Sequence, residues 1–383
     1  MLRKSPPLPQ VPRMFVAAHA QDDHWSRAVD GCLKGLSPQS AQANLGFVYI
    51  SDRFAAEVGD ILARLRSETG VLHWVGTVGL GICGTGVEFH DQAAISILLA
   101  ALPADAFRVV SAGTGAGFDL SPAHQAWNQS AKPYLAVVHG DPAADQLEAR
   151  VRHLSESMDS GFLVGGLSSS RTLRPQVADG LVSGGLSGVL LTRAVPMSIR
   201  VTQSCVPIGP RHRITGCQDN VLVELDGRPA LEVFQEEIGE VLSRDLSKVA
   251  GFIFAGFPVR GTDTGDYLVR NLLGVDEENE LLVVDERLVP GEPMHFCRRD
   301  AASAREDLER MLGDLKEGLS GPPKGGLYYS CIARGASLFG EQSEEVRTIH
   351  AALGDFPLAG FFGAGEISNH RLYSYTGVLA LFL

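Results

Sequence analysis

Residues 326–340 read GLYYSCIARGASLFG, residues 341–355 read EQSEEVRTIHAALGD, and residues 356–383 read FPLAGFFGAGEISNHRLYSYTGVLALFL. The first and last segments contain apolar runs of four to seven residues, and the middle segment has the spacing of an amphipathic helix. A glycine-rich turn with an acidic residue, GAGE (363–366), ends the second apolar run. This pattern predicts strand, helix, strand, glycine turn and strand, which is the order of a mixed α/β unit.

The same order of elements occurs twice more, nearer the amino end. One copy places its strands, helix and turn at 46–51, 55–67, 72–88 and 93–99. Another, looser copy places them at 134–139, 143–158, 162–168 and 186–191. Three copies of one pattern indicate duplication, although each is longer than a stacking solenoid repeat. A chance resemblance between strand–helix–strand segments is the alternative.

Chain length predicts the domain organisation. A chain of 383 residues exceeds what one core normally supports, so we expect two domains. The predicted fold class is α/β (α+β, mixed sheets), with two related domains built from repeated strand-helix-strand-strand units. The first domain would span 14–196 and end where a strand-like run meets a proline, and the second would span 197–383. Residues 1–13, which include four prolines, are predicted to form a flexible tail.

Composition and charge argue against several classes of protein. Hydrophobic residues make up 45% of the chain and charged residues 20%, as in an ordinary globular protein with a sizeable core. The net charge is −12 and the Lys and Arg residues are scattered, whereas a nucleic-acid-binding protein needs clustered cations to neutralise phosphates. No run reaches the roughly eighteen apolar residues of a membrane span. The apolar part near residue 15 is too short for a secretory signal.

The six cysteines form neither a CxxC pair nor a metal-site spacing. In a chain of this size we expect reduced, mostly buried thiols, which predicts a cytoplasmic location. We predict no metal and no cofactor. The segment GLGICG (79–84) satisfies the GxGxxG pattern, but a dinucleotide site needs a helix to open directly after it. Because 85–90 has an extended pattern, we do not interpret this segment as a nucleotide site.

Several motifs resemble a known family. CIARGASLFG (331–340), PLAGFFGAGEIS (357–368), YTGVLALF (375–382) and ITGCQDNVLVELDGRPALEVF (214–234) resemble the FIST C-terminal domain. VGTVGLGICGTGVEF (75–89), GFLVGGLSSS (161–170) and SGGLSGVLLT (183–192) resemble the FIST N-terminal domain. The resemblance implies a sensory module that binds a small ligand, with an amino acid as one possibility. Because no output domain is recognisable in the chain, it also implies a separate signalling protein as partner.

The candidate ligand site lies at the acidic glycine turns. Such turns present backbone N–H groups to a carboxylate, and a nearby glutamate accepts hydrogen bonds from an amine, as an amino acid requires. An arginine adds a fork that matches two carboxylate oxygens. The alternative is that Arg334 and Glu366 pair with each other or cap backbone groups. The predicted ligand-binding residues are Gly84, Thr85, Gly86, Glu88, Gly165, Gly166, Cys331, Arg334, Gly363, Gly365 and Glu366.

Two other functions are weighed against the sensory one. Cys331 follows a strand and precedes a loop, which would suit a nucleophile if Arg334 or His350 lowered its pKa. A buried, inert thiol is the alternative. The third hypothesis is a protein-interaction scaffold without a small ligand. The loop SAGTGAG (111–117) is either a surface excursion or part of a site wall.

Overall fold

The computed structural model describes residues 14–36, 38–112, 122–243, 246, 249, 251–259 and 267–383. The predicted tail 1–13 and residues 113–117 of the glycine loop lie outside the described residues. The chain forms two compact units. The first unit comprises Met1–Val201, Met311–Arg371 and Gly377–Leu383, and the second comprises Thr202–Arg310 and Leu372–Thr376.

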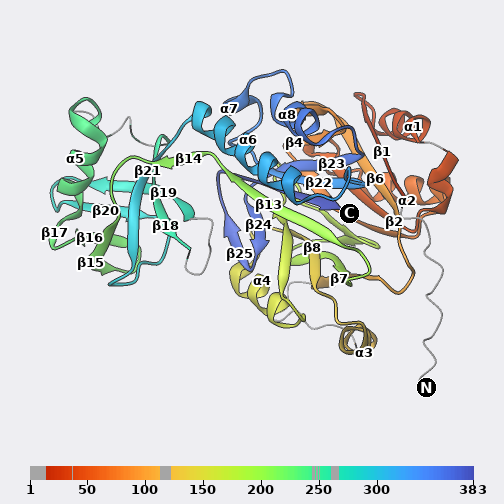
Figure 1. Cartoon of the computed structure of the whole chain (residues 1–383), viewed down its shortest axis with the longest axis horizontal. Coiled ribbons are helices and arrows are strands. Elements are labelled where there is room, and N and C mark those ends of the chain that lie inside the picture. Colours follow the sequence, from red (N-terminus) through yellow and green to blue (C-terminus); the bar gives the residue numbers. More distant parts are fainter. Residues whose placement is uncertain are drawn as a thin grey trace. The chain divides into compact units, whose positions relative to one another are not determined.

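All three predicted copies of the repeated pattern fold into the first unit (Figure 1). The first copy contains β1 (Met14–Gln21), α1 (Trp25–Gly35), η1 (Pro38–Gln42), β2 (Leu45–Ser51), η2 (Asp52–Phe54), α2 (Val58–Thr69), β3 (His73–Gly79), β4 (Gly81–Gly84), β5 (Val87–His90) and β6 (Ala94–Ala101). The second contains β7 (Phe107–Ala112), α3 (Pro122–Ala131), β8 (Leu135–Gly140), α4 (Leu147–Glu156), β9 (Phe162–Leu167), β10 (Gln176–Ala178), β11 (Leu181–Val182) and β12 (Leu186–Leu191). The third contains β13 (Met197–Gln203), α6 (Ala301–Gly318), β22 (Gly325–Cys331), α7 (Ala336–Phe339), α8 (Glu344–Leu353), β23 (Leu358–Gly363), β24 (Glu366–Asn369), β25 (Arg371–Tyr373) and β26 (Thr376–Phe382).

Each copy builds the centre of one six-stranded mixed sheet. The orders are β1-β6-β2-β3-β10-β11, β7-β12-β8-β9-β24-β25 and β13-β26-β22-β23-β4-β5, which we call sheets 1, 2 and 3. In sheet 1, β2 and β3 are parallel and are connected through α2, and β6 runs antiparallel to β2. The equivalent strands are β8, β9 and β12 in sheet 2, and β22, β23 and β26 in sheet 3. The predicted mixed α/β fold class is confirmed.

Hairpins exchanged between copies tie the three sheets together. The hairpin that follows β3 places β4 against β23 of the third copy. The third copy in turn places β24 against β9, and the second copy places β10 against β3. No copy therefore completes its own sheet. This exchange explains why 311–371 and 377–383 belong to the first unit, whereas the sequence interpretation assigned all of 197–383 to one domain.

One glycine recurs at the same place in each copy. A Cβ added to Gly76, Gly165 or Gly360 would lie 1.8 Å from a carbonyl oxygen of the neighbouring parallel strand. We call these three the repeat glycines. Only a residue without a side chain allows the two backbones to approach so closely.

The core of the first unit lies between the inner faces of the three sheets. Phe47, Val137 and Leu327, one from each copy, contribute to this shared core. The outer face of sheet 1 packs against α1 and α2 in a separate cluster around Trp74 and Ile97. Burial of apolar side chains on both faces explains why these strands read as nearly continuous apolar runs.

The described residues of the second unit include an antiparallel barrel, helix α5 and the first part of α6. The described elements that lie wholly within this unit are β14 (Cys205–Pro207), β15 (His212–Gln218), β16 (Val221–Leu225), β17 (Arg228–Pro229), α5 (Ala230–Ser243), β18 (Ile253–Pro258), β19 (Tyr267–Asp276), β20 (Leu281–Val284) and β21 (Pro293–Arg299). The barrel closes because β21 pairs with both β15 and β18. Figure 1 shows α5 beside β16 and β17.

Within the described residues, the model contains no helix with both the length and the apolar character that crossing a bilayer requires.

Candidate functional site

Three aromatic side chains meet in the interior of the first unit. They are Tyr49 on β2, His139 on β8 and Tyr329 on β22. In each copy, the residue just before this one has the carbonyl oxygen that faces the repeat glycine. The hydroxyl oxygens of Tyr49 and Tyr329 are 2.8 Å apart, and the Tyr49 hydroxyl oxygen is 3.2 Å from His139 Nε2. The three repeats thus assemble one hydrogen-bonded cluster from positions up to 280 residues apart.

In sheet 1, the residues that lie beside Tyr49 on the neighbouring strands are also polar and form a row with it. The strand register pairs Tyr49 with Ser96 and Thr77, and pairs Thr77 with Gln176. Directly paired residues lie on the same face of a sheet, and Tyr49 belongs to the shared core, so all four face the interior. Thr77 also shares a 2.6 Å hydrogen bond with the hydroxyl of Ser168.

In the corresponding row of sheet 2, a glycine interrupts the polar side chains. The register pairs His139 with Ser187 and Gly166, and pairs Gly166 with Glu366. Because Gly166 has no side chain, nothing from β9 separates His139 from Glu366 at this level of the sheet. The ring of Phe361 packs over Gly166 instead, because its Cζ lies 3.0 Å from the position of a Cβ added to this glycine.

The row of sheet 3 is apolar apart from Tyr329. Its neighbours along the row are Val378, Phe361 and Ile82. Eight polar residues of the three rows are at most 1% exposed, whereas His19 and Ser111, at the outer ends of the rows of sheets 1 and 2, are not buried. The four buried residues on parallel strands, Tyr49, Thr77, His139 and Tyr329, lie in the carboxyl-terminal half of their strands. We call the eight buried residues the polar layer, which comprises Tyr49, Thr77, Ser96, His139, Gln176, Ser187, Tyr329 and Glu366.

Two atoms of the polar layer have no hydrogen-bond partner among the described residues. They are Nδ1 of His139 and Oγ of Ser96. The neighbouring Ser187 does have a partner, because its hydroxyl donates to Gln176 Oε1 over 2.6 Å. Leaving a buried polar atom without a partner costs about 1–3 kcal/mol, so each such atom in a native structure calls for an explanation.

Burial keeps the titratable groups His139 and Tyr49 of the layer uncharged. Burial lowers the pKa of His139 to about 3, so its imidazole is uncharged at physiological pH. Burial also raises the pKa of Tyr49, with the nearby Tyr329 as a smaller cause, so this hydroxyl keeps its proton. A neutral imidazole presents one donor and one acceptor nitrogen. If Nε2 accepts the Tyr49 proton, Nδ1 is left as a donor.

Most of the predicted site residues gather at the end of this layer. Glu366 pairs with Gly166, and Leu167 N donates to the carbonyl of Gly365 over 2.8 Å. Cys331 pairs with Gly363 on the neighbouring strand. The predicted residues that the structure places around this turn are Gly165, Gly166, Cys331, Gly363, Gly365 and Glu366.

Arg334 forms a buried ion pair that the sequence interpretation missed. Its side chain and that of Glu345 are 0% exposed, and Nε and Nη2 lie 2.8 Å and 2.6 Å from Glu345 Oε1. Burial alone would lower the pKa of Arg334, but the carboxylates of Glu345 and Glu366 raise it. One signal in the sequence pointed to Glu345. It precedes Ile349 and Leu353 at helical spacing, so an acidic residue occupies the apolar face of α8.

The other acidic glycine turn lies elsewhere in the unit. Gly84 pairs with Ala359, four residues before Gly363 on the same strand, or about 13 Å away. Thr85 Oγ1 accepts a hydrogen bond from Leu358 N over 3.0 Å. The reason is that β4 runs antiparallel to β23, so the hairpin carries residues 84–86 toward the start of β23. The structure therefore separates the two turns that the sequence interpretation treated together.

Glu88 anchors the start of α8. Its Oε1 accepts a hydrogen bond from Val346 N over 2.9 Å, and its Oε2 lies 2.7 Å from His90 Nε2. Its backbone N–H donates to Ser343 Oγ over 2.9 Å. A carboxylate at a helix N-terminus is favourable because the first N–H groups of the helix lack partners within it.

Cys331 is 5% exposed and lies far from His350. The His350 ring packs on Phe356 with centroids 4.9 Å apart, and its Nδ1 is 3.2 Å from the carbonyl oxygen of Gly354. Phe356 in turn lies against Gly326, at the opposite end of β22 from Cys331. Five residues of strand span about 16 Å, so His350 does not act as a base for this thiol in the structure.

Comparison with known proteins identifies the family. A FIST N domain model matches residues 44–228, and a FIST C domain model matches residues 230–369. The chain belongs to the FIST family. FIST domains are sensory-type modules. The resemblance seen in the sequence motifs is confirmed.

Relatives that match most of the chain occur in mycobacteria. The uncharacterized protein Rv0628c of Mycobacterium tuberculosis (strain ATCC 25618 / H37Rv) is 31% identical over 340 residues, which cover 85% of this chain and 87% of that protein. The uncharacterized protein Mb0898c of Mycobacterium bovis is 30% identical over 366 residues, which cover 92% of each chain. Both FIST domains supply the polar layer, because Tyr329 and Glu366 lie in the FIST C match and the other six residues lie in the FIST N match.

Proposed function

We propose that this FIST protein is a non-catalytic cytoplasmic sensory module that binds a small ligand, an amino acid, in the polar layer and signals through a separate protein partner. One observation carries the proposal. Eight polar side chains converge in a buried layer, and Nδ1 of His139 and Oγ of Ser96 have no hydrogen-bond partner among the described residues. A site that binds a polar ligand or ordered water explains such atoms, whereas a packed core would not contain them.

The chemistry of the layer suits a zwitterion. Glu345 holds the guanidinium of Arg334, and the carboxyl group of Glu366 offers acceptor oxygens to an ammonium group. His139 Nδ1–H and the Ser96 hydroxyl are donors for the carboxylate of the ligand. In this proposal Arg334 is a positioning residue, because Glu345 holds its guanidinium.

The position of the layer within the strands supports the same function. In open α/β sheets, ligands bind beyond the carboxyl ends of the parallel strands. The layer residues on the first parallel strands, Tyr49, His139 and Tyr329, lie one or two residues before those ends. All six cysteines are free, which suits the reducing conditions of the cytoplasm.

Burial explains how binding could be read by a partner. The residues of the layer are at most 1% exposed, so a ligand reaches them only when the first unit opens. A ligand that binds the closed form more tightly shifts the population toward that form. A partner that distinguishes the open from the closed form would then report the ligand.

A thermal-shift screen of the full chain tests the proposal. The probes are the twenty amino acids, small carboxylates and nucleotides, and the variants are Ser96→Ala and Glu366→Gln, with Ser67→Ala on the exposed face of α2 as control. A ligand at one hundred times its dissociation constant adds about 2.7 kcal/mol to the free energy of unfolding. Because the Ser96 hydroxyl has no hydrogen-bond partner among the described residues, Ser96→Ala should leave the unliganded protein as stable as before and abolish the shift. A shift that both site variants retain, or no shift with any amino acid, would contradict the proposal.

A further inference from the structure

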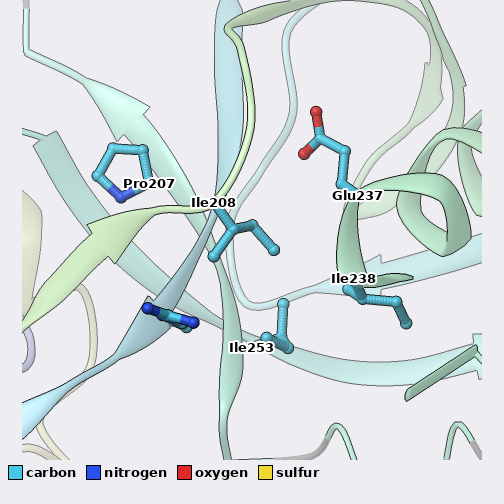
Figure 2. A pocket seen from close by; sticks show the side chains of 6 residues that line it. Pro207, Ile208, Glu237, Ile238 and Ile253 are labelled. Atoms are coloured by element: carbon cyan, nitrogen blue, oxygen red, sulfur yellow. The ribbon is translucent and has the colours of Figure 1, made fainter. Parts of the chain in front are cut away.

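The second unit contains a pocket that the polar layer does not explain. Its volume is about 310 Å³, near the lower end of the range for small-ligand sites. Figure 2 shows Glu237 and Ile238 of α5 on one side of the pocket, Ile208 and Pro207 on the other, and Ile253 of β18 between them. The residues that line the pocket are Pro207, Ile208, Glu237, Ile238, Ile253 and Arg298.

Glu237 is the chemically distinctive residue of this pocket. Its side chain is 9% exposed, and its Oε1 lies 2.6 Å from Nε2 of His212. Its Oε2 is buried and has no hydrogen-bond partner among the described residues. A carboxylate oxygen without a donor is costly in a buried site, so a donor from a ligand or from water is expected there.

The backbone of Gly209 allows the carboxylate to occupy this position. A Cβ added to Gly209 would lie 2.2 Å from Glu237 Oε1 and 2.5 Å from Oε2. Any other residue at 209 would therefore displace the carboxylate or the loop. The glycine at position 209 is therefore a second, independent indication that the local structure accommodates the Glu237 carboxylate.

The charges around Glu237 favour a cation. His212 lies between two carboxylates, with its Nδ1 2.7 Å from Asp226 Oδ2 and its Nε2 2.6 Å from Glu237 Oε1. Burial lowers the pKa of His212, but its hydrogen bonds to Glu237 and Asp226 raise it more, so the net shift is upward. Arg213 also acts on the charge of Asp226, so the attraction for a cation comes from Glu237 Oε2, which has no partner among the described residues. Among the described residues, the cation that lines the pocket is Arg298. It is exposed to solvent and lies near the carboxylate of Asp300, so water and this carboxylate screen its charge.

We propose that this pocket binds a small protonated amine with a short branched hydrocarbon chain. The ammonium donates to Glu237 Oε2, and the hydrocarbon packs against Ile208, Ile238 and Ile253. Burial of the apolar chain supplies affinity, and the single charge-assisted hydrogen bond fixes its orientation. The site is separate from the polar layer and shares no residue with it.

Isothermal titration calorimetry of the full chain with isoamylamine tests this site. Isovalerate is the matched probe, because it has a similar branched chain with a carboxylate in place of the ammonium. The Glu237→Gln variant keeps the shape of the side chain but presents an amide N–H group to the ammonium. Glu232→Gln on the exposed face of the same helix is the control. We expect isoamylamine to bind the unmodified protein and the control, and to bind Glu237→Gln at least tenfold more weakly.

A second variant keeps the test valid if Glu237→Gln does not fold. Ile208→Trp fills the pocket and leaves Glu237 in place, so it should also abolish binding of isoamylamine, with circular dichroism as the check of folding. The proposal is overturned if isoamylamine does not bind at millimolar concentration or if isovalerate binds equally well. It is also overturned if folded Glu237→Gln or folded Ile208→Trp binds isoamylamine with full affinity. Ser96→Ala should leave this binding unchanged, which separates the pocket from the polar layer.

Discussion

Replacement of Glu345 by alanine should destabilise the first unit more than most single substitutions. Glu345 Oε1 accepts hydrogen bonds from Arg334 Nε over 2.8 Å and from the hydroxyl of Tyr328, and the Arg334 and Glu345 side chains are 0% exposed. The substitution leaves a buried guanidinium without its main counter-charge. Breaking a buried ion pair in this way costs about 3–5 kcal/mol, against a typical total stability of about 5–15 kcal/mol.

Removing both charges should cost less than the sum of the two single changes. In the double variant Arg334→Met and Glu345→Met, no ion is left uncompensated by its partner, and replacing a buried pair by apolar residues is often close to neutral. A double-mutant cycle therefore isolates the coupling between the two side chains. Glu366 remains in the double variant, so some destabilisation should persist.

Urea unfolding of the full chain, followed by circular dichroism, measures these free energies. The two units can unfold in separate steps, so the transition of the first unit is fitted by itself. Glu232→Ala, which removes an exposed partner of Arg228, is the control and should cause no measurable change. The reasoning is refuted if Glu345→Ala costs less than about 1 kcal/mol, or if the cycle shows no coupling, because the pair is then not buried as described.

Three further predictions concern the fold, the polar layer and the enzyme hypothesis. Gly76→Ala should prevent folding or lower the melting temperature sharply, because its Cβ would lie 1.8 Å from a carbonyl oxygen, whereas Gly180→Ala meets nothing within 4 Å and should be neutral. His139 should make the free energy of unfolding fall by up to about 1.4 kcal/mol per pH unit as the pH drops from about 6 to 4. The reason is that this residue takes up a proton in this pH range only when the chain unfolds. A His139→Gln variant with the same slope of free energy against pH would contradict this prediction. Iodoacetamide should label the half-buried Cys217 before Cys331, and selective labelling of Cys331 in the native protein would instead favour the cysteine enzyme.

The local pattern of the chain was enough to predict the repeated unit. Short apolar runs beside amphipathic helices marked β2, β8 and β22 together with the helices that follow them, and glycines marked the ends of the strands. Backbone constraints that act over a few residues leave a direct trace in sequence, because an apolar residue or a glycine is required at a fixed spacing. The extended conformation expected after Gly84 was found as β5 for the same reason.

Partners that meet through tertiary contacts left no such trace. The sequence placed Arg334 near a carboxylate, but only the packing of α8 onto β22 determined that Glu345 provides it. The exchanged hairpins, which separate the turn at Gly84 from the turn at Glu366, depend on strand pairings between different copies.

The polar layer shows most clearly the difference between what the sequence determines and what only the tertiary structure determines. Tyr49, His139 and Tyr329 each lie in an otherwise apolar strand, and taken singly each is an ordinary core residue. Their convergence depends on three sheets that share one interior, and this interior exists only after every hairpin has paired with the sheet of another copy. The sequence by itself determined the repeating units and where each one turns, because those features are local. The tertiary structure alone decided which buried polar atoms meet, because hydrogen bonds between residues up to 280 positions apart depend on the position of the whole chain.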